Sequence, residues 1–383
     1  MIKHLVTEKI KEEAFKIGFD AVGISPAHKI PGDRLNDWLD RNYQGKMAYM
    51  EKNAEKRLDP KQVLDGARSL VSLALNYFHD EQLPYEDRTK GVISRYAFGD
   101  DYHKLLLPIL RSLPSRIANF VPEARARYYV DTGPIMDKYW AARGGIGWLG
   151  KNGNLIANKK LGSWFFIAEI LLDVDLEYDS PAKDHCGSCT QCIELCPTEA
   201  IVEPYVVDSR KCISYLTIEL KEDIPTDLRS SMGNLIFGCD ICQDVCPWNR
   251  RVRTSNERAF QSRFQSRSPS LSQLASMDEK DFESSFQKSA LKRTKWRGLM
   301  RNVCVAMGNA ALKEMVPHLK HLLSVKEPMV RRHAAWALKQ VGDEASMNAL
   351  ADRLRVEKDR STIRTLARLI ESVTASEAEH PAL

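Results

Sequence analysis

The sequence predicts an α+β protein of several domains, with an α/β domain first, a cysteine-rich segment next and a helical tail last. Three observations favour this order. Residues 1–180 mix helical and strand-like apolar patterns. Eight of the nine cysteines fall within the 61 residues 186–246. Residues 297–375 have a helical pattern with an internal repeat. A chain of 383 residues is also too long for one ordinary domain.

The composition is that of a globular protein that stays in water. Hydrophobic residues make up 43% of the chain and charged residues 28%. The longest apolar runs fall well short of the roughly 18–20 residues that span a bilayer. The first ten residues mix charge with apolar residues at helical spacing, which indicates a surface helix and not a signal peptide. We therefore expect a cytoplasmic protein.

The first 180 residues predict alternating helices and strands. Residues 8–17 have apolar positions at helical spacing and end at Gly18, while residues 70–75, 126–130 and 163–172 resemble buried strands. There is neither a Gly-x-Gly-x-x-Gly after a strand nor a Walker loop, so nicotinamide or ATP binding through those motifs is unsupported.

The segment Gly144–Gly153 is unusually rich in glycine, with five glycines in ten residues. Glycine gives up much backbone entropy on folding, so this density needs a reason, such as close approach to a large ligand. We interpret the segment as a cofactor or substrate loop. A tight structural loop is the alternative.

The first cysteine run is Cys186-x2-Cys189-x2-Cys192-x3-Cys196-Pro197, the spacing of bacterial ferredoxins. Three thiolates two residues apart converge on one cubane, and the longer step carries the fourth to a second cluster. Zinc sites favour separated Cys-x-x-Cys pairs. The run therefore predicts a ferredoxin-like domain for [4Fe–4S] clusters.

The second run, Cys239-x2-Cys242-x3-Cys246-Pro247, lacks one cysteine, and Cys212 is its expected replacement. Residues 213–220 and 230–236 would then form a helical insertion. A buried free thiol is the alternative for Cys212, and Cys304 is expected in the core. We expect one cluster to be held by Cys186, Cys189, Cys192 and Cys246, and the other by Cys196, Cys212, Cys239 and Cys242.

The C-terminal third predicts a linker followed by helical repeats. Residues 256–290 are rich in Ser and Gln, and residues 250–301 hold 13 Lys/Arg against 5 Asp/Glu. The segments beginning at Arg301 and Arg332 match at an offset of 31, and each leads to a second helix, at 315–323 and 345–354. This period is typical of a HEAT-like solenoid, with a plain helical cap as the alternative.

The ordered combination of motifs resembles the epoxyqueuosine reductase family over most of the chain. The motifs are Glu55-Lys-Arg57 with Pro60, Arg95 with Asp101-Tyr-His103, Val130-Asp-Thr-Gly133, Gly145-Ile-Gly147 with Lys151-Asn152, the Cys186 run with Thr198, Arg210-Lys-Cys212-Ile-Ser-Tyr-Leu-Thr217, the Gly238–Pro247 run, and Trp296-Arg-Gly298 with Arg301-Asn302.

The resemblance implies an oxidoreductase that reduces the epoxide of epoxyqueuosine, at the tRNA wobble position, to queuosine. It implies two [4Fe–4S] clusters: an outer one, held by the set that contains Cys186, where electrons enter, and an inner one, held by the set that contains Cys212, which passes them to cobalamin. The cobalamin would be bound by an α/β cobalamin-binding N-terminal domain, without a protein histidine on cobalt. The expected domains are 1–180 (catalytic), 181–255 (clusters), 256–296 (basic linker) and 297–383 (HEAT-like repeats). A monomer that receives electrons from flavodoxin or ferredoxin is expected.

The resemblance also implies site residues. Asp131 matches the proton donor, although taken alone it would be interpreted as a turn or capping residue. The expected corrin contacts are Arg57, Ser94, Asp131, Leu155, Ile167, Ser214 and Asp240. The basic stretch would follow tRNA phosphates through Lys292, Arg293, Lys295, Arg297 and Arg301, with Trp296 either stacking on a base or packing on the repeat.

Two alternative functions differ in class. A reductive dehalogenase-like enzyme acting on a small substrate would be expected to carry an export signal and no basic helical tail. A protein that only carries electrons or binds tRNA would bind no corrin.

Overall fold

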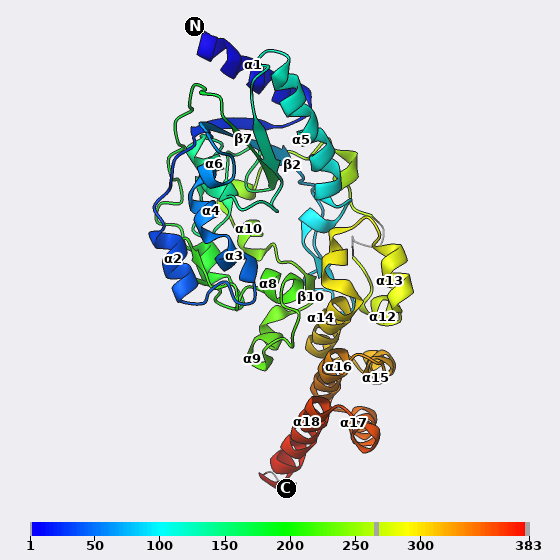
Figure 1. Cartoon of the computed structure of the whole chain (residues 1–383). Coiled ribbons are helices and arrows are strands. Elements are labelled where there is room, and N and C mark those ends of the chain that lie inside the picture. The colour runs from blue at the N-terminus through cyan, green and yellow to red at the C-terminus, as the bar shows by residue number, and fades with distance from the viewer. Residues whose placement is uncertain (1, 264–267, 380–383) are drawn as a thin grey trace. The chain divides into compact units, whose positions relative to one another are not determined.

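The computed structural model describes residues 2–263 and 268–379, and Figure 1 shows the course of the chain. The chain divides into two compact units. Unit 1 comprises Met1–Asp80, Gly99–Cys212 and Asp240–Gln261, and unit 2 comprises Glu81–Phe98, Ile213–Cys239 and Ser262–Leu383. In the described part, no helix is both long enough and apolar enough to cross a membrane.

Unit 1 is built on a four-stranded antiparallel sheet in the order β1-β2-β7-β4. Its strands are β1 (Ala21–Pro26), β2 (Ser69–Asn76), β7 (Phe165–Leu172) and β4 (Ala126–Tyr129). The strands predicted at 70–75, 126–130 and 163–172 are thus confirmed. Every residue of β2 is buried, because both faces of this strand are covered.

Helices cover both faces of this sheet (Figure 1). Helix α6 (Asp137–Arg143) packs on β1, β2 and β7. Glu169 of β7 is the register partner of Ser72 in β2 and accepts a hydrogen bond from its hydroxyl. Helix α5 (Tyr102–Ala118) covers the other face, where Tyr102 stacks on Phe166. Helix α1 (Ile2–Lys16) packs on α5 and β1 and confirms the predicted first helix. Short helices complete this part: α2 (Asp33–Asp40), α3 (Ala48–Lys52), α4 (Ala54–Leu58) and η1 (Pro60–Gln62).

The cysteine-rich part of unit 1 consists of short elements. A hairpin of β5 (Trp148–Leu149) and β6 (Leu155–Ile156) carries the glycine-rich segment at its turn. The two cysteine runs form α7 (Gln191–Glu194) and α10 (Ile241–Asp244), which pack against each other. Further elements are β8 (Ile201–Glu203), β9 (Val206–Val207), η4 (Pro247–Asn249) and η5 (Arg258–Phe260).

Unit 2 begins with β3 (Val92–Ile93), which pairs in parallel with β10 (Leu235–Phe237). Helix α8 (Ile213–Ile218) confirms the first half of the predicted helical insertion. The second half is wrong, because only the turn η3 (Ser230–Met232) precedes Gly233, whose φ of +56° ends it, and the apolar residues that follow are buried as β10. The remaining short elements are η2 (Arg95–Ala97) and α9 (Thr226–Arg229).

The segment predicted as a lightly packed linker contains two helices within unit 2. These are α12 (Leu271–Ala275) and α13 (Glu279–Ser285), followed by η6 (Ala290–Thr294). Leu271, Phe282 and Phe286 are buried at 2% exposure or less. Few apolar residues suffice here because each of them is placed inward at helical spacing.

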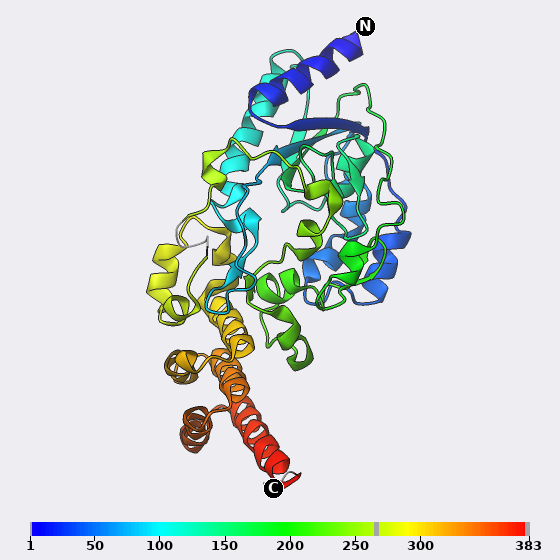
Figure 2. The same cartoon turned by 180° about the vertical axis from the view of Figure 1, so that it is seen from behind.

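The helical tail has the predicted repeat (Figure 2). Helices α14 (Lys295–Ala310), α16 (Pro328–Val341) and α18 (Arg360–Glu379) pack in succession, and α15 (Val316–Leu323, after η7 at Lys313–Met315) and α17 (Glu344–Val356) form the second helices. Gly308 permits the close crossing of α14 and α16, because a Cβ there would lie 2.4 Å from the Trp336 ring. Cys304 is fully buried, as predicted.

Candidate functional site

Asp131 lies in the loop that follows β4 and adopts a left-handed backbone, with φ of +57°. This conformation is uncommon outside glycine and marks positions that the surrounding structure enforces. The Tyr102 hydroxyl donates a hydrogen bond of 2.6 Å to Asp131 Oδ2. Tyr102 is itself fixed, because its ring stacks on Phe166 with centroids 4.2 Å apart. The carboxylate is therefore held in place although its side chain is exposed.

Two further ionisable groups surround this loop. Arg57 Nη1 donates to the carbonyls of Gly133 and Ile135 at 3.5 and 3.3 Å, and burial lowers the pKa of its guanidinium. Burial, and next the charge of Asp131, raises the pKa of Asp137 to about 7. Within the described chain, Arg57 Nε and Asp137 Oδ1 are buried without a hydrogen-bond partner. These two atoms have bonding capacity left for a polar ligand.

Lys138 connects the Asp131 loop with the cysteines electrostatically. Its Nζ donates to the Gly153 carbonyl at 2.8 Å. Burial lowers the pKa of this ammonium, whereas Asp131, Cys242 and Cys212 favour its charged form. Its side chain is nevertheless exposed to solvent.

The four cysteines predicted for the outer cluster converge. Burial, followed by the proximity of Cys246, Cys186 and Cys189, raises the pKa of Cys192 to about 11. Cys246 is buried beside Trp148 and Ile156. Among the described residues, no three metal-binding side chains are close enough to share a single ion, and a cubane, which offers separate irons to its thiolates, does not need them to be. The donor set fits a [4Fe–4S] cluster.

Three of the four cysteines predicted for the inner cluster lie in unit 1. Cys212 and Cys242 both act on Lys138. Cys196, two residues after α7, accepts a hydrogen bond from the Ala200 amide at 3.3 Å. The fourth, Cys239, directly precedes Asp240 in the chain. The packing of α7 on α10 brings the two runs together, as shared cluster loops require.

Three family models match parts of the chain. They are "4Fe-4S double cluster binding domain" at 185–249, "Epoxyqueuosine reductase QueG, DUF1730" at 57–132, and "HEAT repeats" at 290–371. The epoxyqueuosine reductase of Leadbetterella byssophila is 49% identical over 302 residues, which cover 78% of this chain and 97% of the relative. That of Escherichia coli is 38% identical, covering 88% and 89%.

The chain belongs to the epoxyqueuosine reductase family. The family consists of oxidoreductases that use two [4Fe–4S] clusters and cobalamin. Its fold is also shared: a solved epoxyqueuosine reductase with an epoxyqueuosine-modified tRNA-Tyr stem loop has 31% identity and a TM-score of 0.89, covering 96% of this chain and 98% of that one. The reductive dehalogenase-like alternative is thereby set aside.

The residues predicted to contact the corrin are distributed over both units. Arg57, Asp131, Leu155, Ile167 and Asp240 belong to unit 1, and Ser94 and Ser214 to unit 2. Leu155 and Ile167 lie in one apolar cluster, and the charge of Asp131 favours the charged form of Arg57. In unit 2 the Ser94 amide bonds to Phe237 O, and Gly238 approaches Ser94 Cβ closely. Epoxyqueuosine reductases use cobalamin, whose corrin ring carries several amide side chains. The unsatisfied Arg57 Nε and Asp137 Oδ1 could bond to such amides, so these two residues fit this cofactor.

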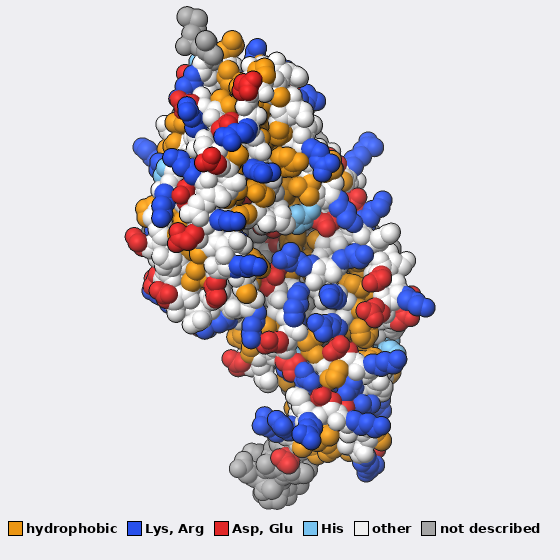
Figure 3. Space-filling model, in the orientation of Figure 1, with side chains coloured by type: hydrophobic (Ala, Val, Ile, Leu, Met, Phe, Trp, Pro, Cys, Tyr) orange, Lys and Arg blue, Asp and Glu red, His pale blue; other side chains and the backbone are white. Residues whose placement is uncertain are grey.

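The basic stretch separates into exposed and buried residues. Lys292, Arg293, Lys295 and Arg297 are exposed, and Figure 3 shows Lys and Arg side chains over the part of unit 2 that carries α14. Trp296 is half-buried and donates its indole N–H to Met277 O at 2.8 Å. The prediction that Arg301 contacts tRNA phosphates is wrong, because its side chain is buried at 1% exposure. Its guanidinium donates hydrogen bonds to the carbonyls of Leu216, Leu220 and Glu222. Arg301 is therefore structural.

Sequence reasoning missed three residues of the Asp131 site: Tyr102, Asp137 and Lys138. Tyr102 belongs to the Asp101-Tyr-His103 motif, but sequence reasoning assigned it no role. Asp137 and Lys138 come six and seven residues after Asp131. The signal for the latter pair was the placement of two charged residues between Ile135-Met136 and the apolar Trp140.

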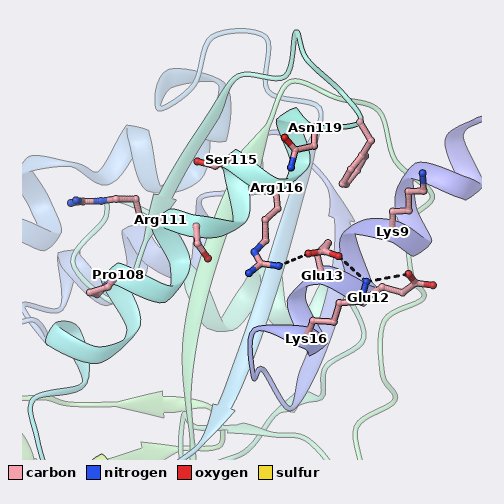
Figure 4. Close-up of a pocket in the computed structure, with 11 residues that line it drawn as sticks. Lys9, Glu12, Glu13, Lys16, Pro108, Arg111, Ser115, Arg116 and Asn119 are labelled. Atoms are coloured by element: carbon pink, nitrogen blue, oxygen red, sulfur yellow. Dashed lines mark hydrogen bonds and ion pairs between the residues drawn. The ribbon is translucent and has the colours of Figure 1, made fainter.

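A recess lies between α1 and α5 (Figure 4) and contains none of the predicted site residues. Its charges pair with one another, since Glu13 bonds Lys16 at 2.8 Å and Arg116 at 2.7 Å. These two partners lower the pKa of Glu13. We assign no role in the reaction to this recess.

Proposed function

We propose that this chain reduces epoxyqueuosine in tRNA to queuosine, with Asp131 as the proton donor. The reaction takes two electrons and two protons, breaks both carbon–oxygen bonds of the epoxide, forms a carbon–carbon double bond and releases water. When bound, the two clusters and cobalamin supply the electrons. The observation that carries the proposal is the 2.6 Å hydrogen bond from the Tyr102 hydroxyl to Asp131 Oδ2, which holds the carboxyl of a chain that is 49% identical to an epoxyqueuosine reductase.

The roles of the chain's own residues follow from the geometry. Asp131 protonates the departing oxygen, which would otherwise leave as a poor alkoxide leaving group. Tyr102 positions the carboxyl through its 2.6 Å hydrogen bond. Lys138 offers a cation where negative charge develops. One solved relative from Bacillus subtilis is described with an aspartate catalytic loop swung out of its active site, and Asp131 likewise lies in a loop with a strained backbone.

The tRNA-binding surface that we propose comprises the exposed Lys292, Lys295 and Arg297, with Arg293 at its edge. Arg293 is already paired with Glu219 at 2.6 Å, so it offers less to a phosphate. Support comes from the relative solved with a tRNA stem loop. Replacing Lys292, Lys295 and Arg297 by Ala should weaken tRNA binding and lower the salt slope by about 3, one for each phosphate contact. An unchanged slope would contradict this surface.

We further propose that a reduced flavodoxin or ferredoxin delivers electrons at the outer cluster, whose loop residues Gly187 and Ser188 are exposed. A monomer in the cytoplasm, where tRNA is found, completes this proposal. The division at residues 180, 255 and 296 remains a prediction.

The decisive experiment compares the wild type with Asp131→Asn. Anaerobically purified protein receives cobalamin and a low-potential reductant, and the loss of epoxyqueuosine from tRNA is measured. We expect turnover by the wild type and a fall of at least about 100-fold in the variant, because general acid catalysis contributes roughly that much. The control is Asp65→Asn, an exposed aspartate in a surface loop. Absence of turnover by the wild type would contradict the proposed reduction of epoxyqueuosine. Unchanged turnover by Asp131→Asn would show that Asp131 is not the proton donor.

A further inference from the structure

The segment Lys151–Asn154 contacts both cluster loops at once. Lys151 Nζ donates to the carbonyls of Gly187 and Cys189 at 2.7 and 3.0 Å, within the loop of the outer cluster. Asn152 Nδ2 donates to Cys242 O at 3.1 Å, and Asn154 Nδ2 lies 3.9 Å from the Cys242 sulfur, on the inner-cluster side. Four consecutive residues therefore span the two centres.

This segment is held rigidly by its own hydrogen bonds. The Gly150 amide donates to Asn154 O at 2.7 Å, and the Asn154 amide donates to Asn152 Oδ1 at 3.0 Å. Gly153 has φ of +76°, which closes the turn. Asn152 is buried at 7% exposure and Asn154 is half-buried, so both amides bond to protein where water has little access. The glycine density predicted to approach a ligand serves here to shape a turn against the clusters.

The electrostatic consequence is specific for each centre. A reduced cluster carries one more negative charge than an oxidised one, so a hydrogen-bond donor or a cation nearby stabilises the reduced form. The Asn154 amide acts on the thiolate of Cys242. The Lys151 ammonium acts on the outer loop, where Gly187 and Ser188 are exposed and water would otherwise solvate the charge.

We propose that Lys151–Asn154 is a brace that joins the two cluster loops and tunes the two centres separately, with Asn154 raising the reduction potential of the inner cluster and Lys151 that of the outer cluster. The proposal rests on the cysteine assignment of the proposed function. When an electron passes from the outer to the inner cluster, the outer cluster becomes oxidised and the inner cluster becomes reduced. Removing the Asn154 donor lowers the reduction potential of the inner cluster, so this transfer becomes less favourable. Lys151 and Asn154 are positioning residues, because they act through the cluster loops.

The test measures midpoint potentials and does not use activity. Full-length protein with both clusters, purified anaerobically and without cobalamin or tRNA, is titrated potentiometrically and followed by electron paramagnetic resonance. Asn154→Leu keeps the side-chain size and removes the donor. We expect the ratio of reduced to oxidised inner cluster at a fixed potential to fall about tenfold, which is about 59 mV for one electron, while the outer cluster keeps its potential. Lys151→Met should lower only the outer potential.

Two further variants make the result unambiguous. Asn154→Asp preserves the shape and replaces the donor with a carboxylate, so it should lower the inner potential further than Asn154→Leu, and it provides the measurement if the Leu variant loses iron. Lys183→Met removes an exposed lysine three residues before Cys186 in the chain, and should leave both potentials within experimental error. Unchanged potentials in Asn154→Asp and Lys151→Met, with full iron content, would overturn the proposal. A wild type that lacks two clusters would instead contradict the proposed function.

Discussion

The Tyr102 hydroxyl donates a hydrogen bond of 2.6 Å to the Asp131 carboxylate, joining the first residue of α5 to the loop after β4. This contact connects two motifs that lie 29 residues apart in the chain. It explains how a loop residue with a left-handed backbone can be presented in one orientation.

Replacing Tyr102 with Phe should lower turnover by up to about tenfold, because a typical intramolecular hydrogen bond contributes roughly 0.5–1.5 kcal/mol. The fold should persist, since the ring still stacks on Phe166. Single-turnover reduction of epoxyqueuosine measures the effect, with the strand residue Tyr128→Phe as the control. Equal rates for Tyr102→Phe and the wild type would show that Asp131 needs no positioning.

Asp137 should make the stability of unit 1 depend on pH. Its pKa is raised from 3.8 to about 7, so the folded state binds its proton more tightly than the unfolded state does. This contribution to stability is fully present below pH 3.8 and is lost as pH rises through about 7. Asp137→Asn should therefore be more stable than the wild type at pH 8, by about 2 kcal/mol, and show a flatter profile between pH 5.5 and 8.

Denaturant unfolding at several pH values, with the same cofactor content, measures this profile. Arg57, Asp131, Lys138 and Glu169 face or act on the same carboxyl and remain unchanged in the variant. Asp33→Asn, at the exposed first residue of α2, is the matched control. A profile for Asp137→Asn parallel to that of the wild type would contradict the raised pKa.

Arg301→Met should destabilise unit 2 by about 3 kcal/mol, because buried carbonyls that lose their donor remain unsatisfied. Arg301→Lys should not restore the loss, since an ammonium cannot reproduce the fork that bonds Leu216 O, Leu220 O and Glu222 O. Arg297→Met, exposed on the same helix, is the control. Thermal unfolding distinguishes the two, and equal melting temperatures would argue against a structural Arg301.

Cys212→Ser should remove the inner cluster and leave the outer one, so the protein should retain about half of its iron. Serine is a poor substitute for a thiolate ligand. Cys304→Ser, in the core of α14, should keep all of its iron. Iron analysis and absorption spectra measure both variants. Full iron content in Cys212→Ser would mean that Cys212 is a free thiol and that another residue completes the inner cluster.

Local chemistry in the sequence by itself determined the two cluster motifs, the strands β2, β4 and β7, and the helical repeats. Cysteine spacing and hydrophobic periodicity are short-range signals that need no knowledge of distant contacts. The family's motif order pointed in the same way to Asp131, whose role remains a proposal.

Only the tertiary structure decided which groups meet around these motifs. Arg297 and Arg301 look alike in sequence and share α14, yet Arg301 is enclosed by backbone carbonyls and Arg297 is exposed, because a helix buries one face. Residues 235–237 became a strand because β3, more than 140 residues earlier, offers them a partner. Tyr102 joined Asp131, and Lys151–Asn154 joined the two cluster loops, through contacts that no local pattern encodes.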